Sequence, residues 1–286
     1  MSNKKRKYLK IVNRLKKALL SSRIPKYLSK FSKKVFTCWQ HIILLVFRQH
    51  ERKSYRDFID WLSFSKLPKA ICLRRIPHFT TLQKFSARMK SIWLDSIMKT
   101  LHNICDIAGV DSTGFSMANS SQYFCSVIGR KVRKFMKLSI IGGMRKKIIM
   151  AVRIRKKRRH DNVDFKPLLE KIKANIIVAD KGYDSEMNHV MAEKHGTKFI
   201  APLRNNVPVC RTSGMHRKFL KRNFPFHLYH ERNKCESIFS ALKRRFGSAV
   251  NGRTFAAQKN ELMFRVLAYN FSRIASFILL LAEDFY

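Results

Sequence analysis

Four residues near the C-terminus place one acid among two cations and an aromatic ring at helical spacing. At successive offsets of 3, 4 and 7 residues, the chain carries Tyr229, Arg232, Glu236 and Lys243. At about 100° per residue, these offsets keep the later side chains within roughly 60° of the first on a helix. Such a stripe can present a metal ligand beside groups that bind anions. The simpler alternative is a surface helix whose Arg232 and Glu236 form an ordinary i,i+4 ion pair, worth ~0.2 to 0.5 kcal/mol.

Two aspartates directly follow short apolar runs that are typical of buried strands. Asp111 follows residues 107–110, and Asp180 follows residues 176–179. We therefore expect each carboxylate at the carboxyl end of a strand, near the sheet edge where ligands collect in open α/β sheets. Each aspartate also has a simpler interpretation, because Asp favours the start of a turn and small or polar residues follow both.

Brought together, Asp111, Asp180 and Glu236 would form a cluster of three carboxylates. Mutual repulsion raises the pKa of carboxyl groups in such a cluster unless a cation is bound. Hard oxygen ligands favour Mg²⁺ or Mn²⁺, and two ions ~3.5 to 4 Å apart can activate an attacking oxygen and stabilise a leaving one in phosphoryl transfer. The three acids therefore predict a divalent-metal site for phosphoryl transfer.

Nearby acids compete for these roles but rank lower. Asp161, Asp184 and Glu186 lie close in the sequence, yet none of them directly ends an apolar run. Asp161 and Asp184 suit the N-cap position of a helix, where a carboxylate accepts a hydrogen bond from a free backbone N–H group.

The charge balance points to a polyanionic partner. The chain has 60 Lys and Arg against 18 Asp and Glu, a formal charge of +42 and a pI near 10.6. Binding to nucleic acid would relieve the self-repulsion and release counterions from the phosphates. The 45% of apolar residues, including 22 Phe, distinguish the chain from a disordered basic tail. No run reaches the ~18 to 20 apolar residues of a membrane span, so we expect no membrane association.

The cysteines indicate neither zinc nor a disulfide framework. The six residues are widely scattered, and none forms a Cys-x-x-Cys pair or a zinc-finger spacing with His. This usage fits reduced thiols in an intracellular protein. The residues are Cys38, Cys72, Cys105, Cys125, Cys210 and Cys235.

The order of apolar patterns predicts an α/β fold. Up to about residue 104, apolar positions return at helical spacing. Five short apolar runs follow, and they predict strands at 107–110, 135–141, 148–154, 176–179 and 198–201. Gly142 and Gly143, after the second run, are interpreted as a turn. Helical spacing separates the last three runs, so the order is three adjacent strands, helix, strand, helix, strand and helix.

This order predicts a mixed sheet flanked by helices and resembles the ribonuclease H fold. We expect an all-helical N-terminal region at 1–104, used for DNA binding or dimerisation. A ribonuclease H-like catalytic domain would occupy 105–250. A C-terminal helical segment would occupy 251–286.

Three motifs together carry a resemblance to a known family. The first two begin at Asp111 and Asp180 and read Asp-Ser-Thr and Asp-Lys-Gly-Tyr. The third begins at Tyr229 and reads Tyr, two residues, Arg, three residues, Glu, six residues, Lys. With these motifs the chain resembles an insertion-sequence transposase of the DDE type, from the grouping with a Tyr-Arg-Glu-Lys signature. The resemblance is strong over about 105–247 and general in the N-terminal third.

The resemblance implies a catalytic mechanism and its residues. Asp111, Asp180 and Glu236 would be catalytic and would bind two divalent ions, Mg²⁺ or Mn²⁺. One ion would activate water or a DNA 3′-hydroxyl for attack on a phosphodiester, first in hydrolysis and then in strand transfer. The residues implied to contact DNA near the cleaved end are Tyr229, Arg232 and Lys243.

The resemblance also implies partners and a location, and two other functions stay open. The partners would be DNA, as inverted-repeat ends and as target, and a second copy of the chain in a homodimeric active complex. The location would be the cytoplasm of a prokaryotic cell, in association with the nucleoid. One alternative is a non-enzymatic nucleic-acid-binding protein, which would bind DNA without metal-dependent cleavage. The other is a metal-dependent nuclease of the same fold.

Overall fold

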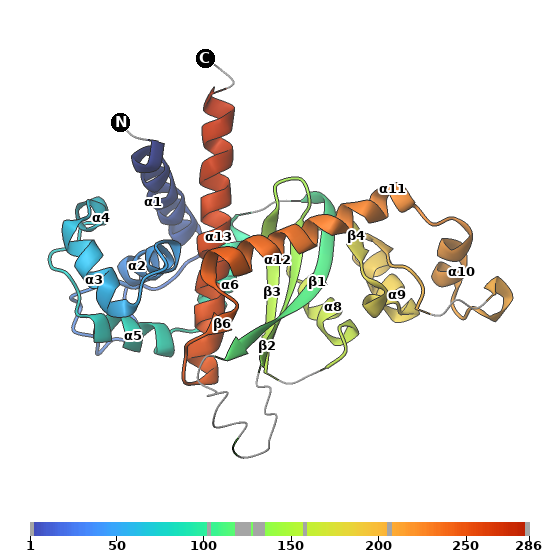
Figure 1. Cartoon of the computed structure of the whole chain (residues 1–286), viewed down its shortest axis with the longest axis horizontal. Coiled ribbons are helices and arrows are strands. Elements are labelled where there is room, and N and C mark those ends of the chain that lie inside the picture. The colour runs from blue at the N-terminus through green and yellow to red at the C-terminus, as the bar shows by residue number, and fades with distance from the viewer. Residues whose placement is uncertain are drawn as a thin grey trace. The chain divides into compact units, whose positions relative to one another are not determined.

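The chain divides into two compact units. The structure is a computed structural model, and it describes residues 3–101, 104–117, 127, 135–156, 159–204 and 208–283. One unit consists of Met1–Thr100 and Arg244–Tyr286, and the other of Leu101–Lys243. Figure 1 shows the first unit as helices and the second as a sheet with helices around it. Of the helices in the described residues, none combines the length and apolarity that a membrane crossing needs.

Two helices form the centre of the helical unit. α2 (Cys38–His50) is buried along most of its length, as expected of a helix that is apolar on nearly every side. A capping box fixes its start, because the Gln40 backbone N–H donates to the Thr37 side chain and the Gln40 side chain accepts from the Thr37 N–H. α13 (Phe255–Glu283) packs against α2 and against three further helices, which are α1 (Asn3–Ser21), α5 (Phe79–Arg88) and α6 (Ser91–Lys99). The remaining elements are α3 (Tyr55–Phe64), α4 (Leu67–Ala70) and β6 (Ala249–Val250).

The second unit contains the predicted mixed sheet. Its five strands are β1 (Cys105–Met117), β2 (Phe135–Gly143), β3 (Ile148–Arg155), β4 (Ala174–Ala179) and β5 (Lys198–Ile200). They lie in the order β3-β2-β1-β4-β5, in which β2 is antiparallel to β1 and β3, while β4 is parallel to β1 and β5. This arrangement, with helices on its faces, confirms the predicted ribonuclease H-like fold.

The predicted turn at Gly142 and Gly143 was wrong. Both glycines lie within β2, and the chain turns afterwards, at residues 144–147. Gly142 pairs with Gly109 of β1 in the sheet register. Gly109 and Gly142 therefore adjoin each other on one face of the sheet.

One face of the sheet carries the apolar core of this unit. α8 (Asn162–Leu169) packs against β2 and β3, and α9 (Glu186–Lys194) packs against α8 and β5. Because strand side chains alternate between faces, Ala108 and Val110 of β1 and Ile177 and Ala179 of β4 enter this core together. The buried cluster includes Ala108, Val110, Ile141, Phe165, Leu168, Ile177, Ala179 and Tyr183.

A fully buried carboxylate joins α8 to the same face of the sheet. Asp164 Oδ1 pairs with Arg153 Nε at 2.9 Å and also with Arg155, and its Oδ2 lies 3.5 Å from Lys137 Nζ. Ser139 Oγ donates to the same Oδ2 at 2.9 Å. One acid thus compensates cations from two adjacent strands, which makes it a structural element and not an open binding group.

Removing this acid should destabilise the fold. In Asp164→Ala the paired cations of β2 and β3 lose their partner, and we expect the free energy of unfolding to fall by ~3 kcal/mol. Urea unfolding followed by circular dichroism measures the change. Asp106→Ala, which removes an exposed acid from β1, is the matched control and should stay within ~0.5 kcal/mol of the wild type. Equal losses in the two variants would contradict the role assigned to Asp164.

Candidate active site

The register of two parallel strands places Asp111 beside Asp180. The last pair in the register of β1 and β4 joins Val110 to Ala179, so the two aspartates follow at the same level on neighbouring strands. Neighbouring strands lie about 4.8 Å apart. The expectation that Asp111 ends its strand was wrong, because β1 continues to Met117 and Asp111 pairs with Ile140 of β2. What ends at Asp111 is the pairing with β4.

The alternation of side chains directs both aspartates away from the apolar core. Val110 and Ala179 belong to the buried cluster on the α8 face. Asp111 and Asp180 follow them directly, so their side chains belong to the opposite face. Figure 1 shows α12 (Asn233–Phe246) lying across the sheet. The two carboxylates therefore share the side of the sheet on which α12 packs.

A pair of glycines lets α12 approach the sheet closely. A Cβ atom added to Gly109 would lie 2.5 Å from Cys235 Sγ, and one added to Gly142 would lie 2.8 Å from Ile238 Cδ1. Real side chains do not approach so closely, so α12 occupies the space that side chains would fill at these two positions. This contact places Cys235, the residue before Glu236, directly over Gly109, two residues before Asp111.

The four signature residues lie on a helical path that is not one regular α-helix. Tyr229 ends α11 (Phe226–Tyr229), Arg232 ends the 3₁₀ turn η3 (His230–Arg232), and Glu236 and Lys243 lie in α12. Backbone angles stay right-handed helical through the junction, with φ −59° and ψ −24° at His230. η3 contacts both β1 and β4. The helical spacing was therefore a sound basis for placing these residues on one stretch, although a tighter turn interrupts it.

Arg232 is the centre on which the acids converge. Its Nη1 lies 3.1 Å from Glu236 Oε1 and its Nη2 lies 3.9 Å from Asp180 Oδ2, and its side chain is 17% exposed. Burial alone would lower the pKa of this guanidinium, but attraction to Asp111, Asp180, Tyr229 and Glu236 raises it. The ion pair with Glu236 is the i,i+4 pair of the simpler interpretation, and the same arginine also faces the sheet acids.

Asp111 is the most shielded of the three acids. Burial raises the pKa of its carboxyl, against a hydrogen bond from the Ser112 backbone N–H (2.7 Å) and the field of Arg232. The negative charges of Asp180 and Asp161 raise the pKa further. By contrast, the side chains of Asp180 and Glu236 are 43% and 64% exposed. The site thus combines one desolvated carboxylate with two accessible ones.

The acids offer suitable donor atoms for a hard cation without forming a complete cage. Among the described residues, no three His, Cys, Asp or Glu side chains are arranged as a group that could hold a metal ion. The donor chemistry fits Mg²⁺ or Mn²⁺, because all three groups are carboxylates. Lys181 N–H donates to Asp180 Oδ1 as Ser112 N–H does to Asp111 Oδ1, which leaves Oδ2 of each without a hydrogen bond from the described residues.

The two remaining signature residues differ in their distance from the acids. Tyr229 stacks edge-on against Phe224 at 5.3 Å, and burial raises the pKa of its hydroxyl, with smaller contributions from the nearby acids. Lys243 lies two turns beyond Glu236, about 10 Å along α12, with its Nζ 5.5 Å from the centre of the Phe115 ring. The structure brings Tyr229 to the acids and places Lys243 further along the same face.

Asp161 occupies the predicted N-cap position of α8, whereas the prediction for Asp184 was wrong, because Ser185 is the N-cap of α9. Asp161 precedes α8, but its side chain makes no capping hydrogen bond. Asp184 instead forms a two-point pair with Arg217, with both N–O distances 2.8 Å, and it accepts from the Arg204 backbone N–H. Asp161 accepts from Ser112 Oγ and so lies beside the candidate site. Sequence spacing held no signal for this contact, since it links residues 49 positions apart.

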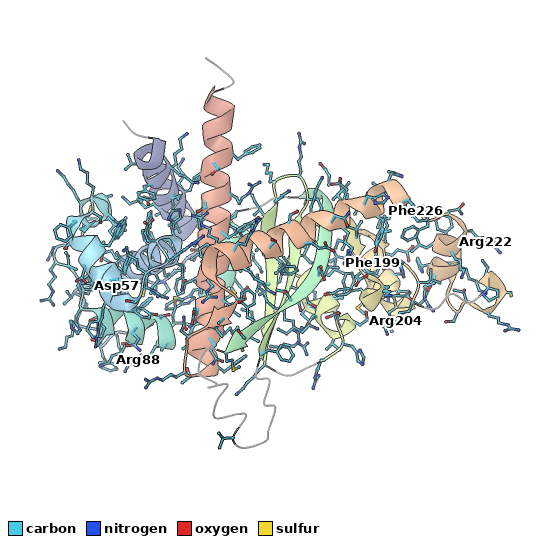
Figure 2. The ribbon with its side chains drawn as sticks, viewed as in Figure 1. Asp57, Arg88, Phe199, Arg204, Arg222 and Phe226 are labelled. Carbon is cyan, nitrogen blue, oxygen red and sulfur yellow. The ribbon has the colours of Figure 1, made fainter. Side chains whose placement is uncertain are left out.

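A groove lies on another part of this unit, between α9, β5 and α10 (Met215–Arg222). Its volume is about 590 Å³, and Phe199 and Phe219 are among the residues that line it. Figure 2 labels Phe199, and also Arg222 at the end of α10. His216 joins α10 to α9, because its Nδ1 lies 2.8 Å from Glu186 Oε1 and its Nε2 lies 3.3 Å from Glu193 Oε2. The hydrogen bond with Glu186 raises the pKa of His216, against a smaller effect of burial.

Comparison with known proteins identifies a family and finds similarity to a solved structure. Residues 106–271, more than half of the chain, match the family model described as Transposase DDE domain. Among solved structures, the chain is similar to the piggyBac transposase in a cryo-EM structure of its synaptic complex with hairpin DNA. The TM-score is 0.48 and the sequence identity 11%, over 93% of this chain and 72% of that chain. No curated protein sequence matches the chain.

The close approach of α12 can be tested at Gly109. In Gly109→Ala the new methyl group meets Cys235 Sγ, and we expect the free energy of unfolding to fall by ~1 to 3 kcal/mol. Adding Cys235→Ala should restore part of this loss, because it removes the sulfur. Urea unfolding of the two single variants and the double variant measures both effects.

Gly114→Ala is the control on the same strand. Its added Cβ would be 3.6 Å from the nearest atom, in the Phe135 ring, which is an ordinary contact. Its stability should stay close to that of the wild type. A Gly109→Ala variant as stable as Gly114→Ala would show that α12 is not held by the glycine pair.

The stability that His216 of α10 contributes through its ion pair with Glu186 of α9 should depend on pH. The pKa of His216 is raised in the folded chain, so its contribution to stability is complete below the usual histidine range and is lost as pH rises through the raised value. The difference in urea midpoint between the wild type and His216→Gln should therefore shrink between about pH 6 and pH 9. A difference that stays constant over this interval would contradict the ion pair.

Proposed function

The chain belongs to the transposases with a DDE domain, and from this we propose that it cuts and joins DNA by divalent-metal-dependent phosphodiester hydrolysis and strand transfer. The substrates in this proposal are the inverted-repeat ends of an insertion sequence and a target DNA. The observation that carries the proposal is the placement of Asp111 and Asp180 side by side, with Glu236 joined to them through Arg232.

In this proposal, Asp111, Asp180 and Glu236 hold Mg²⁺ or Mn²⁺, two ions in the active complex. When bound, such ions activate an attacking oxygen and stabilise a leaving one. Asp111 fixes the position of the site, because β1 pairs with β2 at Asp111 and with β4 up to Val110. Asp180 and Glu236 are exposed and can respond to a ligand. The shared chemistry of the three side chains supports the choice of metal.

The cations beside the acids suit a phosphate-bearing substrate. The guanidinium group of Arg232 is planar and carries several N–H donors, so it can bind a phosphate group through two parallel hydrogen bonds. Tyr229 offers a hydroxyl and a ring beside the same acids. Lys243, about 10 Å along α12, would meet a later phosphate of the same strand. These three residues are therefore proposed to hold the DNA near its cleaved end.

The rest of the chain supports DNA binding by charge. A formal charge of +42 gives strong and salt-dependent attraction to a polyanion. We assign DNA binding or dimerisation to the helical region 1–104, catalysis to 105–250 and a supporting role to the helical segment 251–286. A homodimer in the active complex, and action in the cytoplasm of a prokaryotic cell in association with the nucleoid, are part of the same proposal.

One observation favours a second function, a non-enzymatic DNA-binding protein. The ion pair between Arg232 and Glu236 is the ordinary helix pair, and it occupies the acid that the catalytic proposal needs. In the second function the three acids would only moderate a basic surface. Metal-dependent cleavage separates the two functions, and strand transfer separates a transposase from a nuclease of the same fold.

The purified protein should nick DNA that carries the sequences flanking its own coding region, in the presence of Mg²⁺ or Mn²⁺. Asp180→Asn keeps the size of the side chain and the acceptor for Lys181 N–H but removes a charged ligand. We expect it to lose cleavage by more than the ~10- to 100-fold that an outer-shell partner costs. Gel-shift binding at fixed salt should change little.

Asp106→Asn is the control, since it removes an exposed acid from β1 and should cleave like the wild type. Cleavage retained in Asp180→Asn would contradict the catalytic role proposed for Asp180. A wild-type protein that binds DNA tightly and never cleaves it with either metal would favour the non-enzymatic function.

A further inference from the structure

A fourth carboxylate lies next to the candidate site, on the other side of the sheet. Asp161 stands directly before α8, and its side chain is 34% exposed. Ser112 follows Asp111 in β1, so the two side chains leave the strand on opposite faces. Ser112 Oγ donates to Asp161 Oδ1 at 2.8 Å. Asp161 therefore holds the strand at the residue after Asp111.

The other oxygen of Asp161 lies against the segment that follows Asp180. A Cβ atom added to Gly182 would be 3.2 Å from Asp161 Oδ2 and 4.0 Å from Asp161 Cβ. The shorter distance is tighter than nine in ten real contacts of a Cβ atom. Asp161 therefore occupies the space beside Gly182 that a side chain would need. One side chain thus lies against both segments that carry the sheet aspartates.

A buried lysine fixes the orientation of this carboxylate. Lys137 is 8% exposed and forms an ion pair with Asp161. The same Nζ donates to the Arg159 carbonyl at 2.9 Å and lies 3.5 Å from the buried Asp164. These partners hold the Lys137 ammonium group in one place. The ion pair with this group restricts the movement of the Asp161 side chain.

We propose that Asp161 is a positioning residue of the acidic site, which acts through Ser112 and Gly182 to set the spacing of Asp111 and Asp180. The inference rests on the proposed function, since the spacing matters only if the two aspartates share a cation. Partners that orient a metal ligand commonly change metal affinity by ~10- to 100-fold when they are removed. Ser112 adjoins the proposed metal ligand Asp111, and Asp161 accepts the hydrogen bond of Ser112, so both are candidates for such partners.

The alternative is an acid that serves only to neutralise Lys137. In that case Asp161 would affect stability, while Ser112 would have no connection to metal affinity. The two roles therefore differ in the behaviour of Ser112→Ala, which removes the hydroxyl that joins Asp161 to the strand and leaves the pair with Lys137 in place. Asp161→Asn provides a second distinction, because its amide oxygen can still accept from Ser112 Oγ.

The test is calorimetric titration of Mn²⁺ into the full chain, without DNA. Asp161→Ala and Ser112→Ala should each weaken Mn²⁺ binding by at least ~10-fold. The double variant should be no weaker than the weaker single variant, because both changes break the same link. Asp161→Asn should retain most of the affinity. Asp106→Asn should bind Mn²⁺ like the wild type.

Thermal unfolding of the metal-free variants separates folding from binding. Ser112→Ala removes one hydroxyl and should keep the fold, so it carries the test even if Asp161→Ala fails to fold. A folded Ser112→Ala that binds Mn²⁺ as tightly as the wild type would overturn the positioning role while the proposed function stands. Losses that add in the double variant, or an Asp161→Asn as weak as Asp161→Ala, would also overturn it. A wild type that binds no Mn²⁺ would overturn the proposed function and this inference with it.

Discussion

The arrangement of the acidic site depends on how closely α12 packs on the sheet. Two glycines that pair across β1 and β2 leave room only for hydrogen atoms beneath Cys235 and Ile238. A larger residue at either position would move the helix away from the sheet, and Glu236 would move with it. The geometry of one carboxylate is therefore set by the absence of side chains on two strands, one of which also carries Asp111. Close packing of this kind tolerates little change in volume.

Arg232 explains how several acids can lie close to one another. Repulsion among carboxylates opposes their convergence, and a guanidinium in their midst reduces it. Attraction to these acids raises the pKa of Arg232, so its charge persists at every ordinary pH. The arginine thus acts as a resident counter-charge. A ligand with its own positive charge would compete with Arg232 for the carboxylates. The guanidinium would then be able to bind a phosphate.

Much of the unit formed by Leu101–Lys243 could be predicted from local sequence, and the differences share one physical cause. Apolar runs located all five strands, and the order of strands and helices indicated the fold, because burial imposes a period that can be read along the chain. The continuation of β1 past Asp111 depends on pairing with β2, which local sequence does not encode. The predicted turn at Gly142 and Gly143 was wrong. Gly142 accommodates α12, which packs on it from a distant part of the chain, and local sequence does not show this contact. Asp161 occupies its predicted N-cap position but bonds Ser112, and Asp184 bonds Arg217 instead of capping a helix. Local sequence cannot indicate these partners, because they lie 49 and 33 residues away.

The register between β1 and β4 has a consequence for how this chain can vary. Side chains alternate with a period of two, so the loss or gain of one residue within β4 would turn Asp180 toward the apolar core and replace it by a neighbour. Substitutions elsewhere in the strand alter packing by degrees, whereas a single-residue insertion or deletion removes the site in one step. The spacing between the start of β4 and Asp180 is therefore fixed far more strictly than the identity of the residues that fill it.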